Sequence, residues 1–236
     1  MTTLVLLRHG LTAITGPVLA GRTPGVHLDD RGIAQAAEAA KRLAGVNLAA
    51  IVSSPLERCQ ETAEAVAAAN GMSVETEPRL VECGYGDWTG QELKKLAKDP
   101  LWKVVQAHPS AVTFPGTEGE SLRAAQARAV DAVRSWNVKL GPDAVWLACS
   151  HADIIKSVVA DALGMHLDEF QRIVIDPCSV TVIRYTALRP FVIRVNDSGS
   201  ALSALLSPPT AAKKTRKARA GSSDADAVVG GGAGAT

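Results

Sequence analysis

The sequence has no apolar run long enough to cross a membrane and no strong net charge of either sign. Among its 236 residues, 25 are Lys or Arg and 24 are Asp or Glu, so the formal net charge is +1. This balance predicts no general attraction to nucleic acid or to a membrane surface. A charged leader with an apolar core is also lacking, because Arg8 and His9 follow only four aliphatic residues. We therefore expect a cytoplasmic protein with neither a membrane nor a nucleic-acid partner.

Cysteine is sparse, and its positions follow no metal-binding or disulfide pattern. The four cysteines show neither a Cys-x-x-Cys spacing nor a Cys/His ligand spacing; they are Cys59, Cys83, Cys149 and Cys178. Their number is also low for a disulfide scaffold. We interpret them as reduced residues that pack in the core.

The apolar content of 47% is enough for one sizeable core. Periodic apolar segments continue to about residue 205 and are followed by Pro, Ala, Lys, Arg, Ser and Gly, with five cations between Lys213 and Arg219. Such a composition cannot bury enough apolar surface to order itself. We predict one domain over residues 1–205 and a disordered basic and Gly/Ala-rich tail over 206–236, to which we assign no function.

Apolar strands alternate with helical patterns along the predicted domain. Strands are expected at 4–7, 49–53, 74–77 and 144–149, and helices at 33–44, 54–70, 119–138 and 153–163. Two final strands, 179–185 and 191–196, are separated by a short segment and predict an antiparallel pair. The alternation predicts an α/β fold with three layers, α/β/α, around a mostly parallel sheet with an antiparallel edge.

Chemically useful side chains follow three of these strands. Arg8-His9, Ser53-Ser54 and Ser150-His151 all lie at predicted carboxyl ends. Because the carboxyl ends of parallel strands meet at one edge of a sheet, we expect these three regions to share one crevice. Imidazole can attack phosphorus, and a guanidinium can bind two phosphoryl oxygens. Arg58, about one turn into a helix that follows a strand, would add a second cation and a helix dipole.

A loop rich in glycine and aromatic residues supplies a candidate acid. It runs from Leu80 to Gly90, and it contains the carboxylates Glu82 and Asp87. An apolar wall against Glu82 would raise its pKa, and a carboxyl group that keeps its proton can protonate a departing alkoxide. Asp87 is the rival carboxylate in the same loop.

Taken in order, these motifs resemble the histidine phosphatase superfamily, the phosphoglycerate mutase-like proteins, over residues 4 to about 196. They are Arg8-His9-Gly10, Ser54-Pro55-x-x-Arg58, Leu80-x-Glu82-x-x-x-Gly86-x-Trp88-x-Gly90 and Ser150-His151. Further matches are Leu28-x-x-x-Gly32-x-x-Gln35-Ala36, Thr62-Ala63-Glu64 and Pro115-Gly116-x-Glu118-x-x-Ser121-Leu122. The resemblance implies a phosphoglycerate mutase-like fold.

The resemblance also implies roles for individual residues. His9 corresponds to the nucleophile that becomes phosphohistidine, and Glu82 corresponds to the proton donor. Arg8, Arg58 and His151, the last as a protonated imidazole, correspond to the phosphate pocket, so that neither a metal nor a cofactor is required. Two positions depart from the common pattern: Thr15 stands where asparagine is frequent, and Ala152 where glycine is frequent. Thr15 can still donate one hydrogen bond to phosphate.

The resemblance leaves three functions open. The stretch between Glu82 and His151 is short for the family, and a short cover over the site favours hydrolysis of small phosphorylated metabolites. Phosphoglycerate mutase-type phosphoryl transfer is the alternative, which the lysines near the expected entrance keep open; these are Lys94, Lys95, Lys98 and Lys103. A phosphate-binding module without turnover is the third, although every chemical residue of the pattern is present. A homo-oligomer is possible, and the sequence does not identify the substrate.

Overall fold

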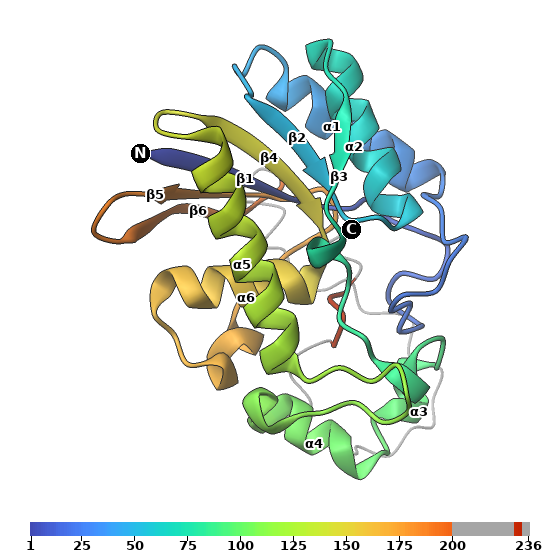
Figure 1. Ribbon diagram of the computed structural model, residues 1–236. Helices are drawn as coiled ribbons and strands as arrows, with labels where there is room; N and C mark the ends of the chain where they lie inside the picture. Colours follow the sequence, from blue (N-terminus) through green and yellow to red (C-terminus); the bar gives the residue numbers. More distant parts are fainter. Residues whose placement is uncertain (200–228, 233–236) are drawn as a thin grey trace.

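The computed structural model describes residues 1–199 and 229–232 and shows three layers around one β-sheet (Figure 1). In these residues six strands form the sheet, in the order β3-β2-β4-β1-β5-β6. They are β1 (Thr2–Arg8), β2 (Ala50–Ser53), β3 (Val74–Thr76), β4 (Val145–Ser150), β5 (Val180–Tyr185) and β6 (Pro190–Asp197). Strands β1 to β4 are mutually parallel, whereas β5 runs antiparallel to both β1 and β6. The predicted mostly parallel sheet with an antiparallel edge is confirmed.

Helices cover both faces of this sheet. The α-helices are α1 (Asp30–Leu43), α2 (Glu57–Asn70), α3 (Leu93–Leu96), α4 (Pro100–Ala107), α5 (Leu122–Leu140) and α6 (Ala152–Leu163). Short 3₁₀ helices occupy Pro78–Leu80, Gly86–Trp88, Pro109–Ala111 and Leu167–Arg172. In Figure 1, α1 and α2 lie behind the sheet, α5 and α6 lie in front of it, and α3 and α4 lie beyond the ends of the strands. The three predicted layers are therefore present.

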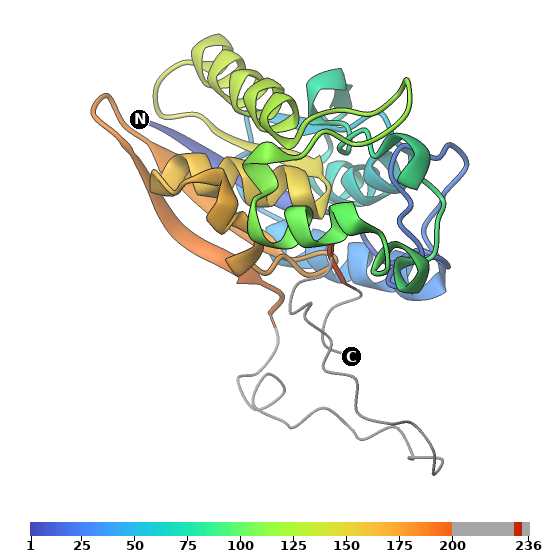
Figure 2. The ribbon, with the colours of Figure 1, turned by 90° about the horizontal axis from the view of Figure 1, so that it is seen from below.

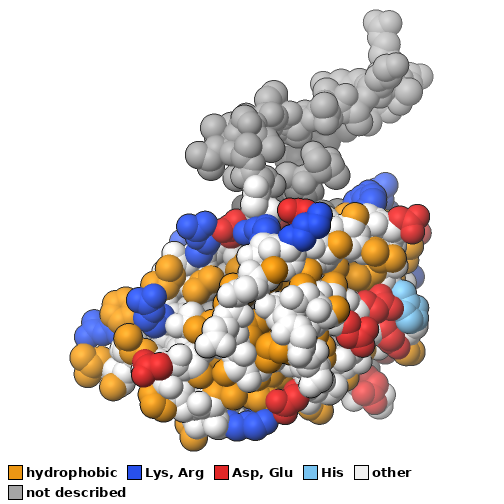
Figure 3. Space-filling view, turned by 90° about the horizontal axis from the view of Figure 1, so that it is seen from above, with side chains coloured by type: hydrophobic (Ala, Val, Ile, Leu, Met, Phe, Trp, Pro, Cys, Tyr) orange, Lys and Arg blue, Asp and Glu red, His pale blue; other side chains and the backbone are white. Residues whose placement is uncertain are grey.

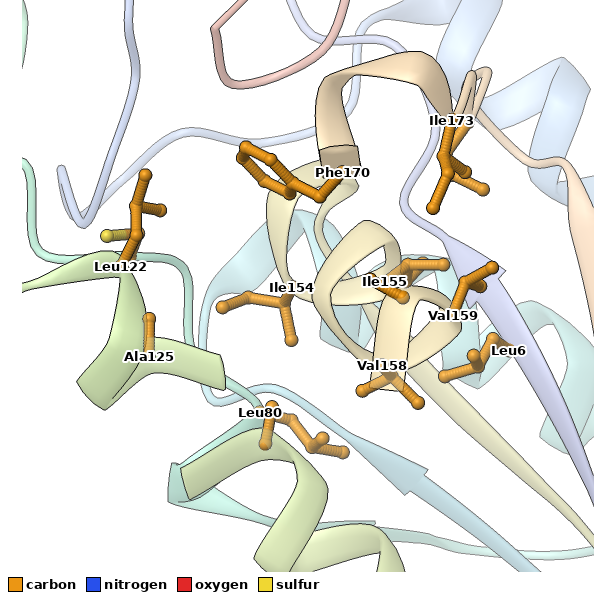
Figure 4. Packing of buried hydrophobic residues seen from close by; sticks show 14 of the residues in the cluster. Leu6, Leu80, Leu122, Ala125, Ile154, Ile155, Val158, Val159, Phe170 and Ile173 are labelled. Carbon is orange, nitrogen blue, oxygen red and sulfur yellow. The ribbon is translucent and has the colours of Figure 1, made fainter. Parts of the chain in front are cut away.

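The central strand β1 shows why the sheet is buried on both sides. Successive side chains of a strand point to opposite faces. Accordingly, Leu4 and Leu6 join the apolar cluster under α5 and α6, whereas Val5 and Leu7 join the cluster under α1 and α2. Figure 4 shows the first cluster, in which Ile155, Val158 and Val159 of α6 lie close to Leu6. A strand covered on both faces has the continuous apolar pattern from which it was predicted.

Three predicted helix starts differ from the structure by three residues each. Helix α1 begins at Asp30, before the expected residue 33. Helix α2 begins at Glu57 rather than at Ser54, because the backbone of Leu56 is still extended. The Ser54 hydroxyl pairs with the His151 ring, with Oγ 2.8 Å from Nε2. Helix α5 begins at Leu122, where Ser121 caps it by accepting a hydrogen bond from the Ala124 N–H. As a result, Arg58 lies in the first turn of its helix, closer to the positive end of the helix dipole than expected.

The predicted tail falls almost entirely outside the described residues, as does the predicted domain boundary at 205/206. Residues 229–232 are described, and they lie among the ribbons of the domain, as the red segment in Figure 2 shows. In the parts of the chain that the structure describes, no helix combines the length and the apolar character that a membrane span needs. On the face shown in Figure 3, charged side chains of both signs are interspersed with hydrophobic and uncharged surface.

Candidate active site

The sheet topology brings the predicted site residues together. β1 and β4 are neighbours, β2 flanks β4, and Arg8 lies opposite Ser150 in the register of the sheet. Five ionisable side chains meet beyond these strand ends, and none is more than 6% exposed: Arg8, His9, Arg58, Glu82 and His151. Four of these residues, His151 excepted, line one pocket together with Thr12, Thr15, Tyr85 and residues 16, 18–21 and 229–231. The expected convergence of three strand ends is thus seen in the structure.

The hydrogen bonds of His9 determine its protonation. Its Nδ1 lies 2.7 Å from the carbonyl oxygen of Gly10, which can only accept, so Nδ1 carries the proton. The Arg58 Nε–H donates to Nε2 of His9 at 3.3 Å, so Nε2 presents a lone pair. Burial and the charges of Arg58 and Arg8 hold the pKa of His9 well below its usual value. The ring is therefore a neutral imidazole with its free nitrogen beside two guanidiniums.

Glycine at position 10 allows this arrangement. A Cβ added to Gly10 would lie 2.7 Å from the carbonyl oxygen of Gly32, so any side chain would displace the turn from the start of α1. The Gly10 N–H also donates to the hydroxyl of Thr62 on α2, at 3.1 Å. The turn that carries His9 is thus packed tightly between α1 and α2.

Two buried guanidinium nitrogens face this site without a partner. Among the described residues, neither Nε of Arg8 nor Nη1 of Arg58 has a hydrogen-bond partner, although both atoms are shielded from solvent. The remaining contacts hold the two side chains in place: Arg8 Nη1 donates to the Ile175 carbonyl, and Arg58 Nη2 donates to the Gly21 carbonyl, both at 2.8 Å. Because leaving a charged donor unpaired is costly, these two nitrogens point to an anionic ligand.

His151 is a neutral imidazole in the unliganded protein, whereas the protonated imidazole that the resemblance implies belongs to the phosphate-bound site. Its Nδ1 accepts from the Arg58 Nη2–H at 3.2 Å, so the proton is on Nε2, which donates to the Ser54 hydroxyl at 2.8 Å. Burial and the positive charge of Arg58 hold its pKa well below the usual value. The cause is the complete enclosure of the ring, which a sequence does not reveal. The His9 and His151 rings lie 5.3 Å apart, centroid to centroid.

Glu82 has the environment expected of a proton donor. It is 4% exposed, and one carboxylate oxygen lies 4.0 Å from Nδ1 of His151. Burial, together with the negative charge of Asp153, raises the pKa of Glu82 from its usual 4.5 to about 7, against the opposing effect of the Cys83 N–H and the two arginines. A carboxyl group with this pKa can both give and take a proton near neutral pH. The rival Asp87 is exposed and does not line the pocket.

A cluster that sequence reasoning missed holds the backbone of Glu82. Arg128 of α5 donates to the carbonyl oxygens of Arg79, Val81 and Glu82, at 2.6, 2.7 and 3.0 Å. Its guanidinium is held by both carboxylate oxygens of Glu120, at 2.8 and 2.9 Å. Glu120 also binds Arg22, whose Nε donates to the same Glu82 carbonyl. The motif Pro115-Gly116-x-Glu118-x-x-Ser121-Leu122 draws attention to Glu118. The carboxylate that holds Arg128 is instead Glu120, which directly precedes the Ser121 helix cap, a position that could have identified it.

The remaining sequence candidates divide between pocket and core. Thr15 lines the pocket, and its hydroxyl oxygen accepts from the Thr12 N–H at 3.0 Å, so its own proton can go to Thr12 or to a ligand. Ala152, the other position that departs from the common pattern, is buried at the beginning of α6. The described residues contain no group of three or more His, Cys, Asp or Glu side chains placed to hold a metal ion.

The α/β/α fold holds a histidine and two arginines beyond the ends of its parallel strands, an arrangement suited to phosphoryl transfer. Comparison with known families agrees. A family model of the histidine phosphatase superfamily (branch 1) matches residues 4–198. The chain belongs to this superfamily. Its resemblance to phosphoglycerate mutase-like phosphatases, predicted from the ordered motifs, is confirmed.

Individual relatives include both hydrolases and a mutase. The chain is 30% identical to phosphoserine phosphatase 1 of Hydrogenobacter thermophilus, over 83% of this chain and 92% of that protein. It is 27% identical to a 2,3-bisphosphoglycerate-dependent phosphoglycerate mutase of Thermoplasma acidophilum, over 76% and 85%. A solved mycobacterial glucosyl-3-phosphoglycerate phosphatase superposes with a TM-score of 0.73 at 25% identity, over 83% and 98%. The chain spans 38% of the length of two uncharacterised Mycobacterium tuberculosis proteins, to which it is 46% identical over 77 residues.

Proposed function

We propose that the protein hydrolyses small phosphomonoesters through a phosphohistidine intermediate on His9. One observation carries this proposal: the neutral Nε2 of His9 lies beside Arg58, and within the described part of the chain both Arg58 and Arg8 have a buried nitrogen without a partner. A phosphoryl group in the pocket would satisfy these donors and present phosphorus to the His9 lone pair. The arrangement combines a nucleophile with the electrostatic stabilisation that phosphoryl transfer requires.

In the first step, Nε2 of His9 attacks phosphorus, and the bond from phosphorus to the ester oxygen breaks. The departing alkoxide takes the proton of Glu82, whose raised pKa keeps a large protonated fraction near neutral pH. In the second step, water attacks phosphorus and the phosphorus–nitrogen bond breaks. Glu82, now a carboxylate, takes the proton of that water, and the site returns to its starting state with phosphate as the second product.

His151 takes part in this scheme through its charge state. A phosphate dianion between the two arginines offsets the positive field that lowers the pKa of His151 in the free protein. The ring then gains a proton on Nδ1 and gives up its hydrogen bond from Arg58, so that it too can donate to a phosphoryl oxygen. The scheme needs neither a metal ion nor an organic cofactor.

The names of the relatives supply the candidate substrates and the alternative function. Phosphoserine, glucosyl-3-phosphoglycerate and 3-phosphoglycerate belong in a first substrate panel, because the relatives named above include two phosphatases and a mutase. A mutase returns the phosphoryl group to the bound sugar acid instead of to water. The similarity to the Thermoplasma acidophilum mutase keeps that transfer as the second candidate.

The test is a paired assay of the protein and its His9→Ala variant, in which free phosphate and 2-phosphoglycerate are followed separately. We expect free phosphate from at least one ester and none above background from the variant, together with an acid-labile phosphoenzyme in the unmodified protein only. Dominant formation of 2-phosphoglycerate from 3-phosphoglycerate, stimulated by a bisphosphoglycerate, would instead identify a mutase. A protein that binds phosphate but forms neither product nor phosphoenzyme would be a binding module.

A further inference from the structure

The segment Val229–Gly232 lies across the pocket that the proposed function assigns to phosphate. The Gly232 carbonyl oxygen accepts a hydrogen bond from Arg8 Nη1 at 2.8 Å, and the Gly230 N–H donates to Oδ2 of Asp153 at 3.0 Å. One contact is made with an arginine that lines the pocket, and the other with a carboxylate of the first turn of α6. In Figure 1 the red segment lies beyond the ends of the central strands, close to the beginning of α6.

Val229 anchors the segment in apolar surroundings. Its side chain is 1% exposed and belongs to the same apolar cluster as Leu19 and Tyr85, which also line the pocket. Tyr85 in turn donates its hydroxyl proton to Asp153 at 2.8 Å, on the carboxylate oxygen that the Gly230 N–H also uses. One apolar and two polar contacts therefore fix the segment in one position.

The glycines of the segment allow its backbone to pass close to Arg8. Gly230 and Gly231 both adopt φ of +76°, a conformation that other residues rarely take. A Cβ added to Gly231 would lie 2.4 Å from Cβ of Ala152 and 3.1 Å from Cζ of Arg8. Only a chain without side chains at this point can approach the guanidinium so closely.

The Gly232 carbonyl takes a place that a phosphoryl oxygen would use. Arg8 Nη1 makes one other hydrogen bond, to the Ile175 carbonyl, which comes from the fold itself. Its second hydrogen bond goes to the Gly232 carbonyl, next to Gly231, which lines the pocket together with Arg8. A phosphate dianion binds a guanidinium more strongly than a neutral carbonyl does, so a ligand can displace the segment, at a cost in affinity.

We infer that Val229–Gly232 is a built-in competitor of the phosphate site: it closes the pocket in the resting protein and must leave when a phosphate or phosphate ester binds. The inference rests on the phosphate pocket of the proposed function but not on turnover. When only a fraction of molecules is open, the apparent Kd equals the intrinsic Kd divided by that fraction. If about one molecule in ten is open, release of the segment tightens phosphate binding about tenfold.

The experiment measures binding of inorganic phosphate to the full chain by calorimetry, for the unmodified protein and for Gly231→Ala. The added methyl group forces the segment off Ala152. Gly141→Ala is the matched control, because Gly141 has nearly the same φ, +78°, and open space where its Cβ would be. We expect Gly231→Ala to lower the Kd for phosphate about tenfold and Gly141→Ala to leave it unchanged. An unchanged or raised Kd in Gly231→Ala would overturn the inference, because the segment would then be neutral or part of the binding site.

Two further measurements guard against a variant that fails to release the segment. Val229→Ser removes the apolar anchor without adding bulk and should shift the Kd in the same direction as Gly231→Ala.

In the unmodified protein, saturating phosphate should speed hydrogen exchange of the amides of residues 229–232, because the Gly230 N–H loses its hydrogen bond to Asp153. Slower or unchanged exchange would mean that phosphate and segment bind together. If the variants bind phosphate more tightly but the protein hydrolyses no ester, this inference stands and the proposed function is rejected. If the protein hydrolyses an ester but the variants do not bind phosphate more tightly, the proposed function stands and this inference is rejected.

Discussion

Nε of Arg58 donates its hydrogen bond to Nε2 of His9 at 3.3 Å, directly onto the lone pair that attacks phosphorus in the proposed mechanism. This contact keeps His9 neutral, because a proton on Nε2 would face a guanidinium. It must also open when an ester binds, since one lone pair cannot serve both partners. Nη1 of the same guanidinium, which has no partner in residues 1–199 and 229–232, offers a second position for a phosphoryl oxygen, so the cation can turn towards the ligand without leaving the site.

The first prediction concerns this guanidinium. Arg58→Lys keeps the charge but removes the planar fork that contacts His9, His151 and Gly21, so we expect kcat to fall about 100-fold. Arg123→Lys is the control, because Arg123 is exposed on α5. Steady-state kinetics on the best ester of the panel measures the effect. Equal rates for the two variants would show that Arg58 serves the fold rather than the reaction.

The second prediction concerns the leaving group. Glu82→Gln removes the proton that the alkoxide takes, and we expect a loss of about 10²- to 10⁴-fold with alkyl esters. In the first turnover of an aryl ester such as p-nitrophenyl phosphate, whose leaving group needs no proton, release of p-nitrophenol should slow much less, because Glu82 is needed there only for the later hydrolysis of the phosphohistidine. Asp87→Asn, in the same loop but exposed, should change neither rate. If first-turnover release of the alkyl alcohol and of p-nitrophenol slows equally in Glu82→Gln, this carboxyl group is not the acid.

The third prediction follows from the raised pKa of Glu82. In the folded protein its pKa is about 7, against 4.5 in the unfolded chain, so between these values the folded state holds the extra proton. Its contribution to stability therefore declines as pH rises through this window and is lowest above about pH 7, by an order of 3 kcal/mol at most. Glu82→Gln should match the unmodified protein in Tm near pH 4 and exceed it at pH 8. A Tm difference that does not change with pH would contradict the raised pKa.

Much of the fold could be predicted because its signals are local. The run Leu4-Val5-Leu6-Leu7 is apolar on both faces, and Asp29 and Gly71 mark helix ends that the structure has. Parallel topology then explains why His9 and His151 meet, since neighbouring parallel strands end at the same edge of the sheet. The site was therefore within reach of sequence reasoning wherever a residue directly follows a strand.

The parts that sequence reasoning missed depend on contacts between distant segments. The protonation of His151 follows from its enclosure and from Arg58, which is 93 positions away in the chain. The contact between Gly232 and Arg8 spans 224 positions, and the composition around it predicts only a tail without contacts. No local sequence pattern reveals contacts between residues so far apart in the chain, because these contacts form only when the fold is assembled.

A fourth prediction concerns metal ions. The proposed mechanism supplies positive charge through Arg8 and Arg58, so prolonged treatment with EDTA and removal of the chelator should leave phosphatase activity unchanged. Added Mg²⁺, Mn²⁺ or Zn²⁺ should not stimulate the treated protein. Loss of activity on chelation, restored by one of these ions, would mean that the guanidiniums do not suffice.

The last prediction concerns Arg128, which contacts neither His9 nor the pocket but holds three carbonyl oxygens of the loop that carries Glu82. Arg128→Met keeps the aliphatic stem and removes these donors, so the loop loses its support and the proton donor its position. A purely structural role would lower Tm and slow all esters alike. A positioning role makes a sharper pattern: kcat for alkyl esters falls by about 10-fold or more, p-nitrophenyl phosphate is spared, and KM changes little. Arg123→Met, on the same helix and exposed, controls for the loss of a cation.

Glu120 holds Arg128 through both of its carboxylate oxygens, so Glu120→Gln should reproduce the pattern of Arg128→Met in weaker form. A uniform loss of activity over all esters in both variants would assign the cluster to stability alone.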